Sequence, residues 1–209
     1  MTDDLVLYTN PMSRGRIARW MLEEVGVPYT AEIIPFGPVM KAPDYRVINP
    51  MGKVPALRHG QHVITECAAI CAYLADAFPQ AGLAPPTMER ADYYRWMFFA
   101  AGPLEASVTN RSLGVEVPPD KRGMIGYGSH STMLEMLEKA VTAKAFVAGE
   151  HFSAANVYVG SHIGWGLQIG SLETRPAFTD YLARVTERPA YRRARDLNDA
   201  EMKALQATG

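Results

Sequence analysis

Strand-like and helix-like segments alternate over the first eighty residues of the chain, and strand-like segments nearly vanish beyond them. Leu5–Tyr8 and residues 29–34 read as short strands, with apolar residues at helical spacing between them up to Gly26. A glycine is common directly after a helix C-terminus. This β-α-β order implies two parallel strands joined by a right-handed crossover. The other face of the intervening helix carries charged residues: Arg14, Arg16, Arg19, Glu23 and Glu24.

A β-β-α group completes the first half of the chain. Prolines and glycines make residues 35–53 irregular, with at most a short helix around Asp44–Ile48. Residues 54–57 and 62–65 predict two strands of a hairpin, and residues 66–78 predict a helix. We therefore expect a four-stranded mixed sheet with helices packed on it, an α/β domain in the order β-α-β-α-β-β-α.

Helical patterns dominate the second half of the chain. Residues 79–86 have the composition of a linker, so we expect one domain over residues 1–80 and an all-α helical bundle over residues 87–209. The helical patterns cover residues 87–109, 120–142, 153–170, 177–186 and the segment from Pro189 onward.

Composition excludes several classes of function. Among 209 residues, 21 Lys and Arg face 22 Asp and Glu, and this near-neutral balance argues against nucleic-acid binding. Two cysteines are too few for a disulfide framework. The acidic start Met-Thr-Asp-Asp does not read as a secretion signal, and no apolar run reaches the roughly 20 residues of a membrane span. We expect a cytoplasmic protein with no nucleic-acid or membrane partner.

Ser13 lies between the first strand and the first helix, where open α/β sheets place their ligands. Its hydroxyl could donate a hydrogen bond to an anion at the helix N-terminus, or it could simply be the N-cap of that helix. Position alone favours the N-cap.

The Val54-Pro55 bond opens a predicted strand, where a proline cannot donate to the hydrogen-bond ladder. An edge strand would explain the proline, and base rates favour that explanation. A cis peptide bond is the alternative, which would turn the N–H and C=O of Val54 outward toward an extended peptide.

Glu66 and Cys67 lie where a strand runs into a helix. Free N–H groups there could hold a carboxylate while Glu66 accepts from an ammonium, which would suit an α-amino acid group. The alternative is that Glu66 only complements the helix dipole. Cys67 and Cys71 share one apolar helix face, which predicts core packing, and no His or Cys nearby has the spacing of a zinc site.

Three segments resemble the cytosolic glutathione S-transferase superfamily over nearly the whole chain. Residues 49–57, NPMGKVPAL, match the family's NPxGKVPxL stretch with its cis proline, and residues 65–70, TECAAI, resemble TESxAI. Residues 152–156, FSAAN, resemble the FSxAD capping signature of the helical domain. The resemblance implies a thioredoxin-like N-terminal domain, a helical C-terminal domain and a homodimer.

The resemblance also implies a binding site for glutathione as cosubstrate, with no metal. In such a site Val54, next to Pro55, pairs its main chain with the cysteinyl part, while Glu66 and the main chain of Cys67 hold the γ-glutamyl end. Lys53 faces the glycyl carboxylate.

Ser13 has the place of the residue that stabilises the glutathione thiolate in the serine-type classes. A hydroxyl donating to sulfur, with helix N–H groups behind it, lowers the pKa of a thiol that otherwise titrates near ~8.5. The thiolate then attacks a small apolar electrophile held by the helical domain. Candidates for the electrophile pocket are Met12, Phe99 and Trp165.

Three departures from the family pattern qualify these expectations. Cys67 replaces the serine of TESxAI, and Asn156 replaces the capping aspartate. Arg14-Gly15-Arg16 resembles the RGR of the tyrosine-type classes, yet Asn10 stands at their catalytic position. Asn10 or Arg16 could therefore share the thiolate contact with Ser13.

Three functions remain open at this point. The leading one is a transferase that conjugates glutathione to small electrophiles. The same site could serve a glutathione-dependent lyase, dehalogenase, isomerase, or peroxide or disulfide reductase. The third is a non-catalytic binding module of the same fold.

Overall fold

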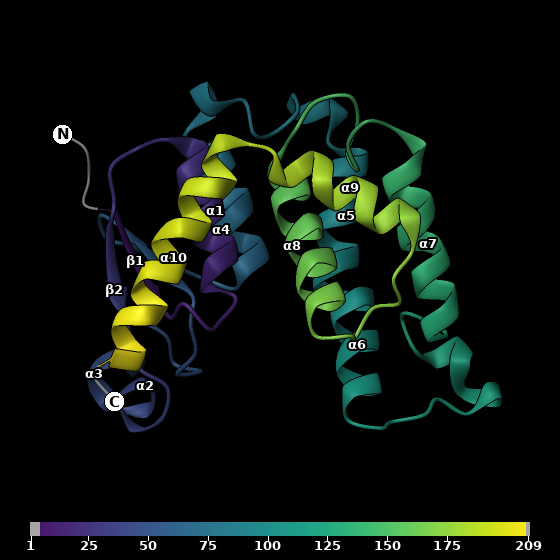
Figure 1. The fold of residues 1–209 in the computed structure, drawn as a ribbon, viewed down its shortest axis with the longest axis horizontal. Coiled ribbons are helices and arrows are strands. Elements are labelled where there is room, and N and C mark those ends of the chain that lie inside the picture. The colour runs from purple at the N-terminus through teal and green to yellow at the C-terminus, as the bar shows by residue number, and fades with distance from the viewer. Residues whose placement is uncertain (1–4, 208–209) are drawn as a thin grey trace. The chain divides into compact units, whose positions relative to one another are not determined.

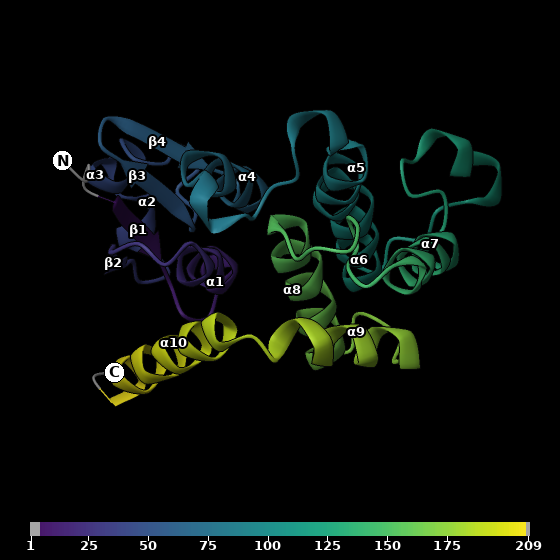
Figure 2. The same cartoon turned by 90° about the horizontal axis from the view of Figure 1, so that it is seen from above.

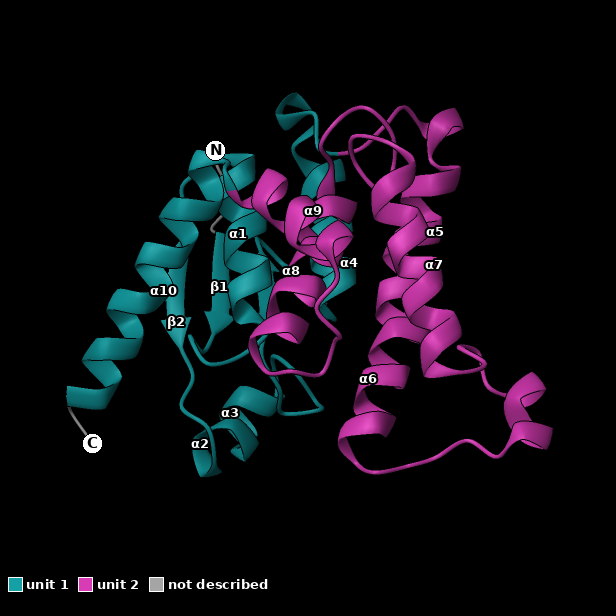
Figure 3. Ribbon diagram, turned by 45° about the vertical axis from the view of Figure 1, so that its right-hand side comes forward, with its two compact units in different colours: residues 1–83, 187–209 teal, residues 84–186 magenta. Residues whose placement is uncertain are grey.

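The computed structural model describes residues 5–207 (Figure 1). Contacts group the chain into two compact units, residues 1–83 with 187–209 and residues 84–186 (Figure 3). This grouping counts the last helix with the first unit, whereas the sequence predicts residues 87–209 as one domain, and the domain assignment stays a prediction. Within residues 5–207, no helix is both long and apolar enough to cross a membrane.

The first unit contains the four-stranded mixed sheet that the sequence predicts, in the order β2-β1-β3-β4. β1 pairs in parallel with β2 and antiparallel with β3, and β3 pairs antiparallel with β4. β1 is buried along its whole length, as its uninterrupted apolar run requires. The strands are β1 (Leu5–Thr9), β2 (Thr30–Ile33), β3 (Ala56–His59) and β4 (His62–Thr65).

The edge-strand explanation for Pro55 is wrong. β3 has a neighbour on both sides, and it begins at Ala56, so that Pro55 precedes the ladder and leaves no missing donor in it. The Val54–Pro55 peptide bond is cis.

In the first unit, α1 lies between α4 and α10 (Figure 2). Gly26 follows α1 with a φ of 75°, the left-handed conformation expected of a glycine after a helix C-terminus. On the charged face of α1, Arg14 is exposed, and the other four residues pair with α10 or with Arg188 just before it. The helices of this unit are α1 (Gly15–Val25), α2 (Pro38–Lys41), α3 (Pro43–Arg46), α4 (Cys67–Ala77) and α10 (Pro189–Ala207).

The second unit is helical, with two departures from the predicted boundaries. The helix expected over residues 87–109 starts at Ala91 and passes through a π-helical turn at residues 100–104, because Pro103 has no N–H for the α-helical ladder. The helix expected over residues 120–142 starts at His130. The helices are α5 (Ala91–Phe99), α6 (Glu105–Ser112), α7 (His130–Ala143), α8 (Ala154–Gln168) and α9 (Pro176–Thr186).

The late start of α7 also has a local cause. Ser129 is its N-cap, with an extended backbone and a side-chain oxygen that accepts from the N–H of Thr132. Gly128, just before it, has a φ of 64°. A left-handed glycine interrupts a helix, so residues 119–124 form only a 3-10 turn.

Asn156 closes the N-terminus of α8 and links it to α9. Its Oδ1 accepts from the N–H of Ser153 at 2.9 Å and from the Ser153 hydroxyl at 3.0 Å. Its Nδ2 donates to the hydroxyl of Tyr181 at 2.9 Å. All three side chains are buried, and burial raises the pKa of Tyr181. The neutral amide thus does the capping work of an acid and also donates across to the next helix.

We expect Asn156→Ala to lower the free energy of unfolding by about 2–4 kcal/mol, because it leaves the Ser153 N–H and the Tyr181 hydroxyl buried without these partners. Urea unfolding of the full chain measures the loss. Asn156→Asp, which keeps an acceptor for Ser153, should lose less than half as much. A loss below about 1 kcal/mol in Asn156→Ala would contradict a structural role for this network.

Candidate functional site

Strand register brings the predicted site segments to one edge of the sheet. Tyr8 in β1 pairs with Ala56 in β3, and Ala56 pairs with Thr65 in β4. Near this row, β1 ends and continues into residues 10–13, and β4 ends and continues into Glu66. β3 begins at the row, directly after Pro55. Three segments that are far apart in sequence therefore meet beside the N-termini of α1 and α4.

Asn10 holds the loop after β1. It is 1% exposed, its Nδ2 donates to the carbonyl of Ile34 at 3.0 Å, and its Oδ1 accepts from the N–H of Met12 at 2.9 Å. Both ends of the amide are occupied by main-chain partners. Asn10 thus has a clear structural role in the loop, and a contact between its amide and a ligand stays a prediction.

Ser13 makes two hydrogen bonds within the same loop. Its hydroxyl donates to the carbonyl of Asn10 at 2.7 Å, and its oxygen accepts from the N–H of Gly15 at 2.9 Å. The N–H of Ser13 also donates to the Asn10 carbonyl, at 3.0 Å. That carbonyl would keep a donor if the hydroxyl proton rotated away. The N-cap of α1 is Arg14, so the N-cap explanation for Ser13 is wrong. Ser13 lies one residue before the cap and retains a proton that can be redirected.

Gly15 is required at the first position of α1. A Cβ at this position would collide with the side chain of Thr9, which is fully buried at the end of β1. The close approach of strand and helix explains the glycine of Arg14-Gly15-Arg16 without any reference to catalysis.

Arg16 spans two parts of the first unit. Its Nε donates to the carbonyl of Pro11 at 2.6 Å, and its Nη2 donates to Oδ1 of Asp199 in α10 at 2.6 Å. No acidic residue of α1 itself lies in its first turn, and the charge of Arg16 is paired with Asp199, so the positive potential here comes from the helix dipole. This end of α1 favours an anion.

Val54 presents an open main chain at the same edge. Among residues 5–207, neither its N–H nor its C=O joins a backbone–backbone hydrogen bond outside the helices and strands, and Val54 itself lies outside both. Pro55 is buried behind it, and Lys53 before it is exposed. An extended peptide could pair with Val54 as a short strand.

Side chains that the sequence analysis did not single out hold this segment in place. The hydroxyl of Tyr45 and the Nδ2 of Asn49 both donate to the carbonyl of Lys53, each at 2.8 Å. Lys41 donates to the carbonyl of Gly52 at 2.6 Å. Burial raises the pKa of Tyr45 to about 12, so it remains a donor at neutral pH. Of these residues, only Asn49 could have been picked out from the sequence, because it begins the NPMGKVPAL stretch.

Glu66 adopts a strained conformation at the start of α4. Its φ is 66° and its ψ 119°, and it is the one residue other than glycine with a positive φ within residues 5–207. Its side chain is exposed. Strain of this kind in an exposed residue next to a helix N-terminus is typical of ligand-binding positions.

Cys67 begins α4 and is 8% exposed. Its Sγ contacts the carbonyl of Arg14 at 3.6 Å, which joins the first turn of α4 to the loop before α1. Cys71 is fully buried, and a hydrogen bond with Cys67, together with burial, holds the pKa of its thiol well above the usual value. Both cysteines pack in the core, and Cys71 has no reactive thiolate.

The three pocket candidates are divided between the units. Met12 is 48% exposed in the first unit. In the second unit, Trp165 on α8 is 45% exposed, and Phe99 on α5 is partly buried with its ring edge-on to Trp96 at 5.4 Å. Each has apolar surface to offer a ligand, and their joint role stays a prediction.

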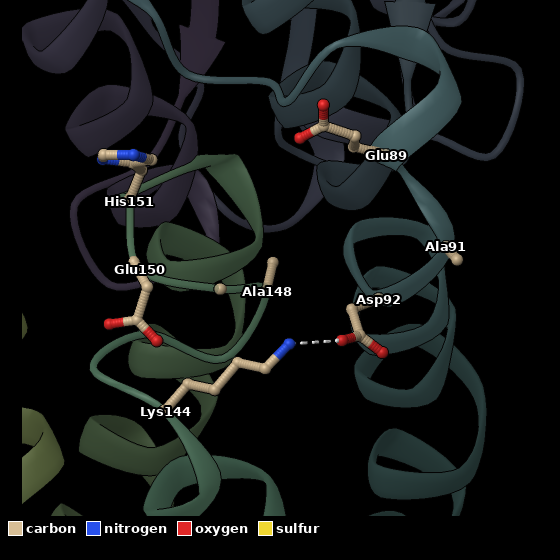
Figure 4. A pocket seen from close by; sticks show the side chains of 8 residues that line it. Glu89, Ala91, Asp92, Lys144, Ala148, Glu150 and His151 are labelled. Carbon is tan, nitrogen blue, oxygen red and sulfur yellow. Dashed lines mark hydrogen bonds and ion pairs between the residues drawn. The ribbon is translucent and has the colours of Figure 1, made fainter.

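A hollow of about 530 Å³ in the second unit has a different character (Figure 4). Lys144 crosses it to Asp92 at 3.2 Å, and Glu89, Glu150 and His151 also line it. None of the predicted site residues takes part. Its carboxylates make it unsuited to a small apolar molecule.

The mixed sheet and its helices form a thioredoxin-like domain, followed by a helical region. Residues 12–77 match the family model described as the glutathione S-transferase N-terminal domain. The chain is 30% identical to glutathione S-transferase A of Pleuronectes platessa over 160 residues, 72% of this chain and 71% of that protein. The chain belongs to the glutathione S-transferase family.

Two further comparisons extend over nearly the whole chain. Glutathione S-transferase GST-4.5 of Xanthomonas campestris pv. campestris is 26% identical over 217 residues, 97% of this chain and 98% of that protein. The crystal structure of a glutathione transferase homologue from Sulfitobacter with bound glutathione is 26% identical, with a TM-score of 0.73 over 94% of this chain and 98% of that one.

We expect Glu66→Gly to be more stable than Glu66→Ala by about 1 kcal/mol, because only glycine relieves the clash of a Cβ at positive φ. Both variants lack the carboxylate, so their difference isolates the backbone. Thermal unfolding of the two variants side by side measures it. Equal stability would show that the conformation of Glu66 carries no strain.

Proposed function

We propose that the chain is a glutathione transferase that binds glutathione along the edge defined by residues 10–13, Val54 and Glu66. The observation that carries the proposal is the unpaired main chain of Val54, held between the N-termini of α1 and α4 by strand register. A tripeptide with a carboxylate at each end fits an edge that combines a strand-like partner with two positive helix ends.

Each part of glutathione has a proposed partner. The γ-glutamyl ammonium pairs with the exposed carboxylate of Glu66, and its carboxylate accepts from the first N–H groups of α4, including that of Cys67. The cysteinyl main chain pairs with Val54 beside Pro55. The exposed ammonium of Lys53 faces the glycyl carboxylate. The Cys67 thiol already contacts the Arg14 carbonyl, so we assign binding there to the main chain.

The reaction depends on ionising the glutathione thiol. A thiol with a pKa near ~8.5 is only a few per cent thiolate at neutral pH. Rotation of the Ser13 hydroxyl proton from the Asn10 carbonyl to the sulfur would supply a donor while the carbonyl keeps its bond from the Ser13 N–H. The positive end of the α1 dipole adds positive potential. The thiolate then forms a bond with the electrophilic carbon, and the leaving group departs with its electron pair.

The remaining parts of the proposal depend on family likeness. A contact of the electrophile with Met12, Phe99 or Trp165 stays a prediction for each residue separately. A homodimer, a cytoplasmic location, a role in detoxification and membership of the serine-type classes stay predictions.

We expect Ser13→Ala to raise the thiol pKa of bound glutathione by about 1–2 units, because a hydrogen bond to a charged group contributes about 1.5–3 kcal/mol. Thiolate absorbance in the far ultraviolet, titrated with pH on the complex, measures the change. Activity at pH 6.5 should fall about 10- to 100-fold, since the thiolate fraction falls tenfold with each unit.

Ser13→Thr is the matched control, because it keeps the hydroxyl and should titrate within about 0.5 unit of the wild type. Unchanged absorbance in Ser13→Ala would move the thiolate contact to Asn10 or Arg16. Failure of the wild type to bind glutathione at all would leave only a non-catalytic module.

A further inference from the structure

Ion pairs join α1 to α10 and to Arg188 just before it, and along both segments the arginines precede the acidic residues. Arg16 pairs with Asp199 at 2.6 Å and Arg19 with Glu201 at 2.7 Å. Nearer the end of α1, Glu23 pairs with Arg193 at 3.0 Å and Glu24 with Arg188 at 2.7 Å. The helices therefore run antiparallel, and the C-terminal half of α10 lies beside the first turn of α1.

The Arg16–Asp199 pair differs from the other ion pairs because Arg16 also contacts the loop after β1. The same guanidinium that binds Asp199 donates through Nε to the carbonyl of Pro11, two residues before Ser13. Asn10 ties this loop to Ile34 beyond the end of β2, and Arg16 ties it to α10. The loop with the Ser13 hydroxyl is thus held from both sides.

Stability does not account for this pair. Its side chains are 28% and 41% exposed, and ion pairs so exposed contribute about 0–1 kcal/mol to folding. A carboxylate that accepts a hydrogen bond from a guanidinium fixes the plane of the guanidinium. Because the Nε–H lies in that plane, its direction is fixed as well. Asp199 therefore selects the Arg16 orientation that reaches Pro11.

We propose that Asp199 is a positioning residue for thiolate formation, acting through Arg16 on the loop of residues 10–13. The catalytic part of this proposal rests on the proposed function. Asp199 touches no substrate. Asp199 fixes the position of the Ser13 hydroxyl relative to the N-terminus of α1. The geometry of the site therefore depends partly on a residue of α10.

The test compares Asp199→Ala with Arg193→Ala. Arg193→Ala removes another partly exposed ion pair between the same two helices, and among residues 5–207 the side chain of Arg193 bonds to Glu23 alone. Both variants should lose similar stability. Asp199→Ala alone should shift the pH profile of kcat/KM for glutathione upward by about 0.5 unit, with about threefold lower activity at pH 6.5. Asp199→Glu should restore at least half of the shift.

Hydrogen exchange provides a second readout that needs no glutathione. The N–H groups of Met12, Ser13 and Gly15 all bond within the loop, and their exchange should accelerate several-fold in Asp199→Ala and stay unchanged in Arg193→Ala. Equal effects in both variants, or no effect in Asp199→Ala, would overturn the positioning role. A downward shift of the pH profile would also overturn it, since Asp199 would then only neutralise Arg16.

The two readouts separate the two proposals. Faster exchange in Asp199→Ala, together with a wild type that forms no glutathione thiolate, would refute the transferase and leave the loop contact standing. If the wild type forms the glutathione thiolate but Asp199→Ala changes neither hydrogen exchange nor the pH profile of kcat/KM, the positioning role is refuted and the transferase stands.

Discussion

The row of paired residues Tyr8, Ala56 and Thr65 determines where everything in the candidate site lies. A slip of one residue between β1 and β3 would put the charged side chain of Arg58 on the face where Leu57 is fully buried, and this opposes the slip. The same burial that stabilises the sheet therefore fixes Val54 opposite the loop of residues 10–13. The strand register thus serves both core packing and the candidate site. A ligand would find these segments already arranged.

The site edge is organised without a ligand. Asn10, Ser13 and Arg16 satisfy the main chain of their loop, while Tyr45 and Asn49 hold the carbonyl of Lys53. Binding to such an edge loses little main-chain entropy, because the main chain that would contact the ligand is already held in place. The strained backbone of Glu66 fits this scheme, since the sheet and α4 fix it on both sides.

Sequence reasoning was most successful where signals are local. The run Leu5–Tyr8, the glycine at position 26 and the capping segment of residues 152–156 each predicted an element that the structure contains. It was wrong about the edge-strand explanation for Pro55, because the place of β3 in the sheet depends on contacts across the fold. Asp199 was out of reach for the same reason, since it meets Arg16 across 183 positions of the chain.

The charge order of α1 shows why α10 belongs to the same unit. Arg16 and Arg19 near the N-terminus and Glu23 and Glu24 near the C-terminus oppose the helix dipole, at about 0.3–1 kcal/mol each. α10 offsets this by placing Asp199 and Glu201 beside the arginines, and Arg188 and Arg193 beside the glutamates.

The arginines at this end of α1 are thereby paired, and the helix dipole remains as a source of positive potential for an anion. Arg19 is 2% exposed, so an unpaired guanidinium there would be costly, and Glu201 offsets part of that cost by accepting from its Nη2. A helix with the opposite charge order would be more stable alone, yet it would repel an anion at its N-terminus. The ion pairs with α10 thus make an anion-binding charge pattern compatible with a stable fold.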